Sequence, residues 1–407
     1  MKRSLFAWLS VFLLVVVFAD RQSAYADCRS FASDIRNGGL LVADAEGKVL
    51  AACNPDQPFI PASILKIATA LIGLRILGPE YRFRTELYQD AARNLYIRGS
   101  GDPFLVAEEV ALVMDRLREE GVRQINGIYV DNSRFALEDD VPGRGTSDNP
   151  YDAPVGATAV NFNTIAFRVE NGGKVRSAEE QTPTLPIMRE LAGGRGPGEY
   201  RLNICQAGCR PEETGARHVA ELFRALQRAR GIPGDGPLGV GRVPADALLL
   251  HAHENSRVLR EVLVSVLEFS NNFVANQVFL ACGAGRYGYP ATWAKARRAA
   301  AEVLAELAGT ETADPIRMVE GSGLSRENRV TARAMVELLR IFAPHAGQLP
   351  ERQGVRLKSG TMAGIHNYAG YLPGSRPFVI LENQQANTRD RLIRRLRNMY
   401  SEEPLAK

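Results

Sequence analysis

An apolar run from Ile64 to Leu74 constrains the fold most, because it predicts a helix whose first turn carries Ser63. Lys66 follows Ser63 by three positions, and no other lysine in the sequence has a serine at that offset. Positions i and i+3 share one face of a helix, so the lysine amine can lie against the serine hydroxyl. A nucleophile and its base need this placement, and the pair therefore indicates a candidate acyl-transfer enzyme.

Residues 1–26 predict a signal peptide for export. Lys2 and Arg3 give a charged start, the stretch from Leu5 to Ala19 is apolar, and residues 24–26 form a small-x-small cleavage site. The apolar stretch is short for a membrane span, although an uncleaved anchor is the alternative. We therefore expect no transmembrane segment after cleavage and a location outside the cytoplasm, most simply a bacterial periplasm.

Charge and cysteine content narrow the function class. The sequence has 50 Lys+Arg and 46 Asp+Glu, a net charge of +4, which gives no reason to expect binding to nucleic acid. In an oxidising compartment Cys205 could pair with Cys209 and Cys28 with Cys53, which would leave Cys282 unpaired. No metal-binding motif is present, so we expect neither a metal nor a cofactor.

Short apolar runs with Gly, Asn and Asp turns predict strands in the first half of the chain. Residues 40–43 and 49–52 predict a hairpin ahead of the Ser63 helix. The strands predicted at residues 95–97, 127–130 and 166–169 form a β-rich unit, broken by a helix from 103 to 120. We interpret this unit, roughly residues 79–245, as an insertion into another domain.

The second half of the chain is mainly helical. Apolar side chains recur at helical spacing from Asn255 to Val278, and residues 291–308 and 331–342 predict two more helices. Residues 377–381 predict a buried strand. The Arg-rich segment from Thr388 to Tyr400 predicts an amphipathic helix packed on a sheet with a solvated basic face, and membrane contact is the alternative.

Two further motifs join the serine–lysine pair. Ser270-Asn271-Asn272 is an S-x-N sequence at a helix edge, and Lys358-Ser359-Gly360-Thr361 precedes a predicted strand at 368–372. S-x-x-K, S-x-N and K-[ST]-G in this order are the signatures of penicillin-interacting serine enzymes. Each motif alone is common by chance, but all three in order on an exported chain are specific.

The chemistry explains these residue types. Lys66 can take a proton from Ser63 only when neutral, which requires its pKa to fall from about 10.4 by about three units, or about 4 kcal/mol. Burial and the nearby charge of Lys358 would both lower this pKa. We expect Ser270 to relay a proton to the leaving amine and Asn272 to hold the substrate's amide.

We predict that Ser359, Gly360 and Thr361 bind substrate, because two hydroxyls beside a lysine suit a free carboxylate. The backbone N–H groups of Ser63 and Thr361 would form an oxyanion hole, where losing one donor typically costs about 10²–10³ in rate. Asp102 is a further candidate substrate contact. The local sequence favours a different role for Asp102, the cap of a helix that begins at the following proline.

The chain resembles D-alanyl-D-alanine carboxypeptidase/endopeptidases of the penicillin-binding protein 4 type, which are low-molecular-mass class C penicillin-binding proteins. The resemblance covers nearly the whole mature chain. It is carried by Pro61-Ala62-Ser63 with Lys66, Gly99-Ser100-Gly101-Asp102-Pro103, Asp131-Asn132-Ser133, the run Glu320 to Asn328, and Asn367-Tyr368-Ala369-Gly370-Tyr371.

This resemblance implies an α/β (α+β) fold, in which a serine β-lactamase/transpeptidase-like domain, an antiparallel sheet flanked by helices, is split by a β-rich insert. The expected boundaries are 27–78 and 246–407 for the two catalytic parts and 79–245 for the insert. It also implies cleavage of D-Ala-D-Ala ends, and often of D-Ala–diaminopimelate cross-links, in peptidoglycan stem peptides. β-Lactam antibiotics would acylate Ser63.

Two other readings remain open. Ser147-Asp148-Asn149 is also S-x-N, and Glu199 to Asn203 copies the E-x-x-L-N spacing of class A β-lactamases, which allows a serine β-lactamase. A scaffold that binds wall peptides without turnover is the second alternative. The oligomeric state is left open by the sequence.

Overall fold

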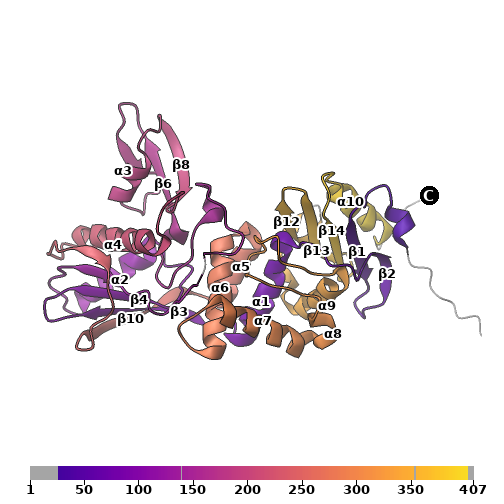
Figure 1. The fold of residues 1–407 in the computed structure, drawn as a ribbon, viewed down its shortest axis with the longest axis horizontal. Helices are drawn as coiled ribbons and strands as arrows, with labels where there is room; N and C mark the ends of the chain where they lie inside the picture. The colour runs from indigo at the N-terminus through magenta and orange to yellow at the C-terminus, as the bar shows by residue number, and fades with distance from the viewer. Residues whose placement is uncertain (1–25, 139, 353, 402–407) are drawn as a thin grey trace, which may run out of the picture.

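The computed structural model describes residues 26–138, 140–352 and 354–401. The predicted signal peptide therefore lies outside the described residues, apart from Ala26. None of the described helices has both the length and the apolar character that a membrane crossing requires. A six-stranded sheet lies at one end of the molecule, a block of helices lies in the middle, and the inserted unit lies at the other end (Figure 1).

The six-stranded sheet is antiparallel and joins the two ends of the chain. In spatial order its strands are β11 (Glu351–Arg352), β12 (Val355–Met362), β13 (Ile365–Leu372), β14 (Arg376–Glu382), β1 (Gly38–Ala43) and β2 (Val49–Cys53). Along β1, Leu40 and Val42 pack on one face of the sheet and Leu41 and Ala43 on the other. Both faces are covered, which explains why β1 is apolar throughout. The predicted hairpin and C-terminal strands are confirmed.

A layer of helices separates this sheet from the inserted unit (Figure 1). It contains α1 (Lys66–Ile76), α5 (Leu259–Phe269), α6 (Asn272–Tyr287), α7 (Trp293–Ala308), α8 (Thr310–Ala313) and α9 (Ala332–Phe342). Helix α1 packs against α5, α6, α7 and α9, and its residues from Lys66 to Gly73 are all buried. A helix enclosed on every side must be apolar all round, which accounts for the run that begins at Ile64.

Helix α10 (Arg389–Met399) covers the opposite face of the sheet. Leu392, Ile393 and Leu396 are buried against that face, whereas the arginines of α10 are not buried. The prediction of an amphipathic helix packed on a sheet is confirmed.

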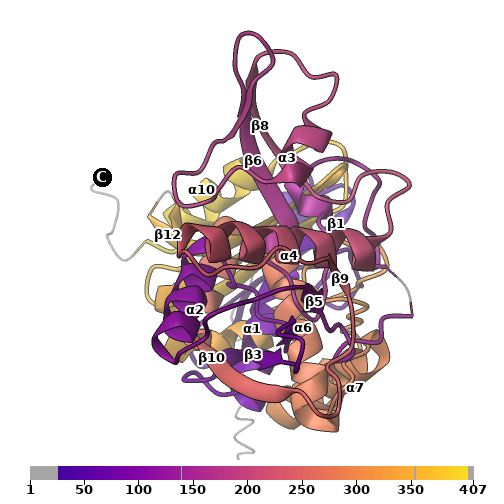
Figure 2. The same cartoon turned by 90° about the vertical axis from the view of Figure 1, so that its left-hand side faces the viewer.

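The described residues of the inserted unit form two sheets and three α-helices. One sheet has the order β10 (Leu248–Val258), β3 (Arg82–Gln89), β4 (Leu95–Gly99), β5 (Ile128–Val130) and β9 (Leu238–Val240). The other has the order β7 (Val175–Ser177), β6 (Thr164–Val169) and β8 (Gly198–Asn203). Its helices are α2 (Ala107–Glu119), α3 (Pro186–Leu191) and α4 (Pro211–Ala229). Figure 2 shows α4 lying across the unit, with β6, β8 and α3 above it.

Two features of this unit differ from the sequence predictions. The predicted boundary at residue 245 falls before β10, which pairs antiparallel with β3 up to Val258, and the helix expected from Asn255 begins at Leu259. Helix α4 was not predicted, although Pro211 and two glutamates form a typical helix start. The strand β10 was not predicted from the sequence because many of its side chains are polar. Asn255 and its neighbours hydrogen-bond inside the unit instead of packing apolar groups.

Both disulfide pairings that the sequence allowed are present. Cys28 is bonded to Cys53 and Cys205 to Cys209, whereas Cys282 is free and buried. The first disulfide ties the N-terminal segment to β2. The second closes a short turn after β8.

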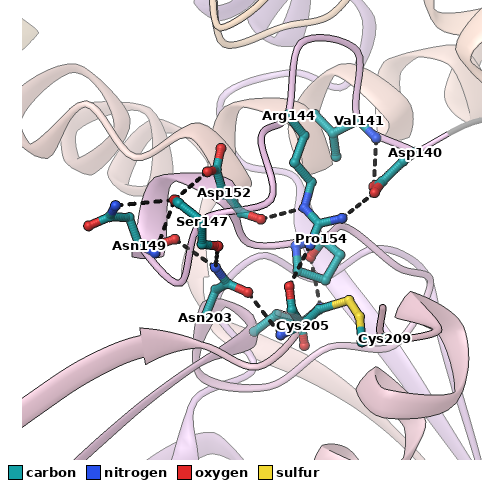
Figure 3. The surroundings of a disulfide bond; sticks show 11 residues. Asp140, Val141, Arg144, Ser147, Asn149, Asp152, Pro154, Asn203, Cys205 and Cys209 are labelled. Atoms are coloured by element: carbon teal, nitrogen blue, oxygen red, sulfur yellow. Dashed lines mark hydrogen bonds and ion pairs between the residues drawn. A yellow bond between two sulfur atoms is a disulfide. The ribbon is translucent and has the colours of Figure 1, made fainter. Parts of the chain in front are cut away.

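Next to the second disulfide, the loop formed by residues 140–154 is attached to the end of β8 (Figure 3). The Arg144 guanidinium donates to the carbonyl oxygens of Asp152 and Cys205. The side-chain amide of Asn203 donates to the carbonyl oxygens of Ser147 and Asn149, at 2.8 and 2.9 Å. These bonds fix the loop that leads to the candidate site described below.

His218 in α4 is fully buried in the core of the inserted unit. Neither ring nitrogen has a hydrogen-bond partner among the described residues, and burial lowers the pKa of His218 to about 4. The unfolded chain therefore binds a proton below about pH 6.5 that the folded chain binds only below about pH 4. Stability should fall as the pH drops through this window.

We expect His218→Leu to remove about 2 kcal/mol of the loss in unfolding free energy between pH 7 and pH 5. Leucine has a similar volume and needs no hydrogen-bond partner. Denaturant unfolding at both pH values measures the effect. His345→Leu, at a half-buried position, is the control and should keep the wild-type pH dependence. An unchanged dependence in His218→Leu would contradict the neutral buried ring.

Candidate active site

Ser63 lies in a 3₁₀ turn, Ala62–Leu65, that runs directly into α1. Ala62 has a φ of 47°, so the chain turns sharply just before the serine. The Asn367 side chain on β13 donates to the carbonyl oxygens of Ile60 and Pro61, at 2.9 and 2.8 Å. The serine is therefore presented by a strained turn that the sheet holds in place.

Lys66 is fully buried at the start of α1. Its Nζ lies 2.9 Å from Ser63 Oγ, and it donates to Asn272 Oδ1 and to the Ser322 carbonyl oxygen, at 2.8 and 2.7 Å. Burial, and next the charge of Lys358, hold the pKa of Lys66 well below its usual value. A neutral amine has two N–H groups and one lone pair. The two acceptor oxygens engage both N–H groups, which leaves the lone pair for the Ser63 hydroxyl proton.

The S-x-N motif forms the connection between α5 and α6. Ser270 ends α5 in the left-handed conformation, with a φ of 58°. Asn271 caps α6 by accepting from the Val274 N–H, and Asn272 is the first residue of that helix. This tight connection directs the side chains of Ser270 and Asn272 towards the two lysines.

Lys358 on β12 completes the cluster from the sheet side. Its Nζ lies 2.9 Å from Ser270 Oγ and donates to the Ser359 carbonyl oxygen at 3.1 Å. Burial, with a smaller contribution from Arg352, lowers the pKa of Lys358 to about 7. The charge of Lys358 thus acts together with burial to favour the neutral form of Lys66.

Gly360 allows β12 to pass close to the turn that carries Ser63. A Cβ at this position would lie 2.7 Å from the Pro61 carbonyl oxygen and 3.1 Å from the Ser63 backbone nitrogen. A side chain here would displace the serine or the strand. The glycine of the K-S-G motif is thus required by the close backbone approach.

Thr361, the next residue, is oriented by Arg389 from α10. The Arg389 Nη1 donates to Thr361 Oγ1 at 2.7 Å and to the Gly360 carbonyl oxygen at 3.2 Å. Sequence reasoning assigned all arginines of this helix to a solvated face and missed this contact. Arg389 stands at the N-terminal end of the helix, but nothing local in the sequence distinguishes it from the other arginines.

A second residue to which the sequence gave no role in the site is Glu320, which was named only as the start of the run Glu320 to Asn328. The Glu320 carboxylate is fully buried and accepts from the Ser322 and Gly323 N–H groups, at 2.7 and 2.8 Å. It also accepts from the Asn328 side chain at 2.6 Å. These bonds hold the loop whose Ser322 carbonyl oxygen accepts from Lys66.

The five residues that the sequence placed in one site form two hydrogen-bonded groups, Ser63 with Lys66 and Asn272, and Ser270 with Lys358, and the charge of Lys358 acts on Lys66. The structure does not place Asp102 there. The Asp102 carboxylate is buried in the inserted unit, where it accepts from the Phe104 N–H at 2.8 Å and the Asn255 side chain at 2.9 Å. Burial raises the pKa of Asp102 to about 6. It holds a turn before α2, which begins at Ala107 instead of residue 103, so Asp102 does not cap the helix either.

The alternative β-lactamase set is not assembled around Ser63. Ser147 donates to the Asp152 carboxylate at 2.5 Å within the 140–154 loop (Figure 3). Glu199 lies on β8, exposed and paired with Arg168. Both residues have structural partners in the inserted unit.

Tyr151 lines two cavities, one of which also has residues of the cluster in its wall. The Tyr151 carbonyl oxygen accepts from the Asn272 side chain at 3.3 Å. One cavity, of about 680 Å³, is lined by Tyr151, Arg326 and Met362 among others. The other, of about 600 Å³, includes Ser270 and Asn272 in its wall.

Comparison with known proteins agrees with this geometry. Residues 32–190 and 205–348, more than half of the chain, match the D-Ala-D-Ala carboxypeptidase 3 (S13) family. The D-alanyl-D-alanine carboxypeptidase of Actinomadura sp. is 29% identical over 412 residues, covering 83% of this chain and 75% of the relative. The D-alanyl-D-alanine carboxypeptidase DacB of Haemophilus influenzae is 23% identical over 430 residues and covers 88% of each chain.

The fold is shared with a solved structure. Penicillin binding protein 4 from Haemophilus influenzae matches with a TM-score of 0.69 at 21% identity, covering 90% of this chain and 96% of that chain. The predicted fold class is confirmed. The family match ends before Lys358, whose place in the cluster is given by β12. The chain belongs to the D-Ala-D-Ala carboxypeptidase 3 (S13) family and is a serine carboxypeptidase.

Proposed function

We propose that this chain is a periplasmic serine D,D-carboxypeptidase that cleaves the D-Ala-D-Ala ends of peptidoglycan stem peptides through an acyl-enzyme at Ser63. The observation that carries the proposal is the set of contacts made by Lys66. Its two acceptor partners leave one lone pair, and that lone pair faces the Ser63 hydroxyl. This is the arrangement of a general base next to its nucleophile.

In the acylation step, Ser63 Oγ attacks the carbonyl carbon of the penultimate D-Ala and its proton passes to Lys66. The backbone N–H groups of Ser63 and Thr361 stabilise the oxyanion. When the C–N bond breaks, the leaving amine takes a proton from Ser270, which is reprotonated by the Lys358 ammonium. The step ends with Lys66 charged and Lys358 neutral.

In the deacylation step, water attacks the ester carbon and gives its proton to Lys358. The ester C–O bond breaks, and Ser63 Oγ regains its proton from Lys66. Both lysines thereby return to their starting protonation states. One water molecule is consumed and one D-Ala is released in each cycle.

The free carboxylate of the terminal D-Ala would be bound on β12. Ser359 and Thr361 supply hydroxyls there, and Lys358 and Arg389 supply positive charge. A β-lactam, which carries a carboxylate next to a reactive amide, would acylate Ser63 by the same contacts.

The location is supported by two features. The sequence begins with a predicted signal peptide, and two disulfides are present, a pattern typical of an oxidising compartment. Fractionation of cells that express the full chain should recover it with periplasmic markers.

Two assays test the function. Labelled penicillin should bind covalently with a stoichiometry of one, and mass spectrometry of a muropeptide pentapeptide should show release of terminal D-Ala. Rapid penicillin hydrolysis would instead indicate a β-lactamase. Penicillin binding without D-Ala release would indicate a scaffold.

The protonation states of Lys66 and Lys358 also determine how kcat/KM depends on pH. We expect kcat/KM to fall as the pH rises through about 7, because Lys358 then loses its proton, and to fall again at low pH, where Lys66 gains one. Lys358→Arg keeps a positive charge at high pH and should move the alkaline limb upward, even at a lower maximal rate. An alkaline limb that stays in place in this variant would contradict the assignment.

A further inference from the structure

A third cavity, of about 370 Å³, lies in the inserted unit at the start of α4. Its wall is formed by residues from the segment 132–140 after β5, by residues 155–158 and by the first turns of α4. None of the five residues of the reactive cluster lines it. The cavity is large enough for a small ligand and is separate from the place where acyl transfer is proposed.

Two amide oxygens in this wall lack a hydrogen-bond partner in the part of the chain that the structure describes. They are Oδ1 of Asn132 and Oδ1 of Asn163, and both atoms are buried. Asn163 is only 2% exposed, and its Nδ2 donates to the Pro154 carbonyl oxygen at 2.8 Å, which fixes the orientation of the amide. A buried acceptor without a donor destabilises the folded chain, so a ligand that brings N–H groups to these oxygens would be favoured.

The mouth of the cavity is acidic. Glu138 and Glu212 are exposed there, and neither has a basic partner among the described residues. Asp140 also lines the cavity but is paired with Arg144 (Figure 3). The partial positive charge of the α4 N-terminus is opposed by Glu212 and Glu213 in its first turn. The lining, all of it within the described ranges, contains no lysine, arginine or histidine, so the cavity favours a cation.

The rest of the wall indicates an organic cation. Phe135, Leu137, Val155 and Ala216 give the cavity an apolar surface, which suits a hydrocarbon chain. No three His, Cys, Asp or Glu side chains in the described parts of the chain are placed to hold a metal ion, whereas Ca²⁺ takes six to eight oxygen ligands. An alkylammonium ion matches all three features, with N–H donors, a positive charge and an apolar chain.

The wall of the cavity is held in place without a ligand. Thr158 Oγ1 accepts from the Gly99 N–H at 2.8 Å, and Gln277 on α6 donates to the Gly156 carbonyl oxygen at 2.9 Å. Gly215 of α4 faces Asn163, since a Cβ on Gly215 would lie 3.9 Å from Asn163 Nδ2. A preformed wall lowers the entropy that binding must overcome.

We propose that this cavity is a binding site for a small primary alkylammonium ion. The ammonium donates to Asn132 Oδ1 and Asn163 Oδ1, and Glu138 and Glu212 balance its charge. Its chain packs against the apolar part of the wall. An alkylamine has a pKa close to that of a lysine side chain, about 10.4, and is therefore protonated at pH 7. The inference goes beyond the proposed function, which uses none of these residues.

The test is a calorimetric titration of the full-length protein with n-butylammonium chloride at pH 7. We expect saturable binding with a Kd of about 1 mM. The double substitution Glu138→Gln and Glu212→Gln should raise this Kd by about tenfold, because the charge of the ligand is no longer balanced. Glu213→Gln is the matched control and should keep the wild-type Kd. Glu213 stands next to Glu212 but is paired with Arg210 and does not line the cavity.

The amide oxygens are tested separately. Asn132→Ala should weaken binding by about tenfold and leave thermal stability unchanged or higher, because the oxygen that it removes has no protein partner. A loss of stability without a loss of affinity would show that Asn132 has only a structural role. Penicillin acylation at the wild-type rate shows that each variant is folded.

Three other ligands complete the test. Tetramethylammonium has the charge but no N–H group, and n-butanol has the chain but no charge, so both should bind more weakly than n-butylammonium by about tenfold. Equal binding of either would overturn the inference, and so would displacement of n-butylammonium by an equal concentration of Ca²⁺. Absence of saturable binding, or an unchanged Kd in the double glutamate variant, would also overturn it. The carboxypeptidase function is not affected by these outcomes, because release of D-Ala tests it independently.

Discussion

Ser63→Ala should abolish covalent labelling by penicillin and reduce D-Ala release by at least about 10³-fold, because the nucleophile that forms the acyl-enzyme is removed. The hydroxyl contributes one contact, to Lys66, and the alanine methyl fits the same turn. We therefore expect thermal stability within about 0.5 kcal/mol of the wild type. Intact-mass spectrometry after incubation with penicillin, together with a thermal scan, measures both properties.

The control for this variant is Ser33→Ala, which removes an exposed serine far from the three motifs in sequence. It should label with the same stoichiometry and rate as the wild type. Persistent labelling of Ser63→Ala would show that another residue is the nucleophile and would reject the mechanism.

Lys66→Met should lower the acylation rate by about 10²–10⁴-fold, the usual contribution of a positioned general base. The free energy of unfolding, in contrast, should stay the same or rise. Below pH 10.5 the unfolded chain carries a proton on Lys66, whereas burial holds the pKa of Lys66 in the folded chain well below that value. Stability is therefore lost as the pH falls below 10.5, and methionine, which has a similar shape and no charge, removes this cost.

We thus expect a variant that is nearly inactive and yet as stable as the wild type or more so. Stopped-flow acylation and denaturant unfolding at pH 7 and pH 9 are the measurements. Lys66→Arg should also be inactive, because an arginine stays protonated and cannot act as a base. Lys174→Met, at an exposed turn, is the control. Rapid acylation by Lys66→Met would require a different base.

The stability expected of Lys66→Met follows from the fact that some groups of the reactive cluster destabilise the folded state. A buried lysine amine and a left-handed Ser270 are both unfavourable by themselves. They persist because α1, the S-x-N connection and β12 are each held by surrounding structure. Such local costs at a reactive cluster are expected where chemistry requires a perturbed pKa.

Several features of the protein were determined by local sequence. The serine–lysine pair depends only on helical spacing, and β1 and β14 of the six-stranded sheet are short apolar runs whose neighbours in sequence are turns. For this reason the three motifs and the central strands of the sheet could be read from the residues, whereas the polar strands β11 and β12 were not predicted. The glycine of the K-S-G motif could also be recognised from the sequence. The reason why a glycine is needed there is the close approach of the backbone of Pro61 and Ser63, which is visible only in the folded structure.

Other features were decided by tertiary structure, because their partners are distant in sequence. Asp102 was a candidate substrate contact in the sequence, yet in the structure its carboxylate accepts a hydrogen bond from the Asn255 side chain on β10. Arg389 differs from the other arginines of α10 only because β12 brings Thr361 to it. The length of β10 likewise follows from pairing with β3, not from its own polar sequence.

The residues along the chain thus determined which groups can react, since a nucleophile, a base and a second cation are recognised by type and spacing. Only the folded structure determined their charge states and the shape of the space around them. A lysine becomes neutral when burial and a neighbouring ammonium act on it together. That combination exists only once α1, the S-x-N connection and β12 have packed against one another.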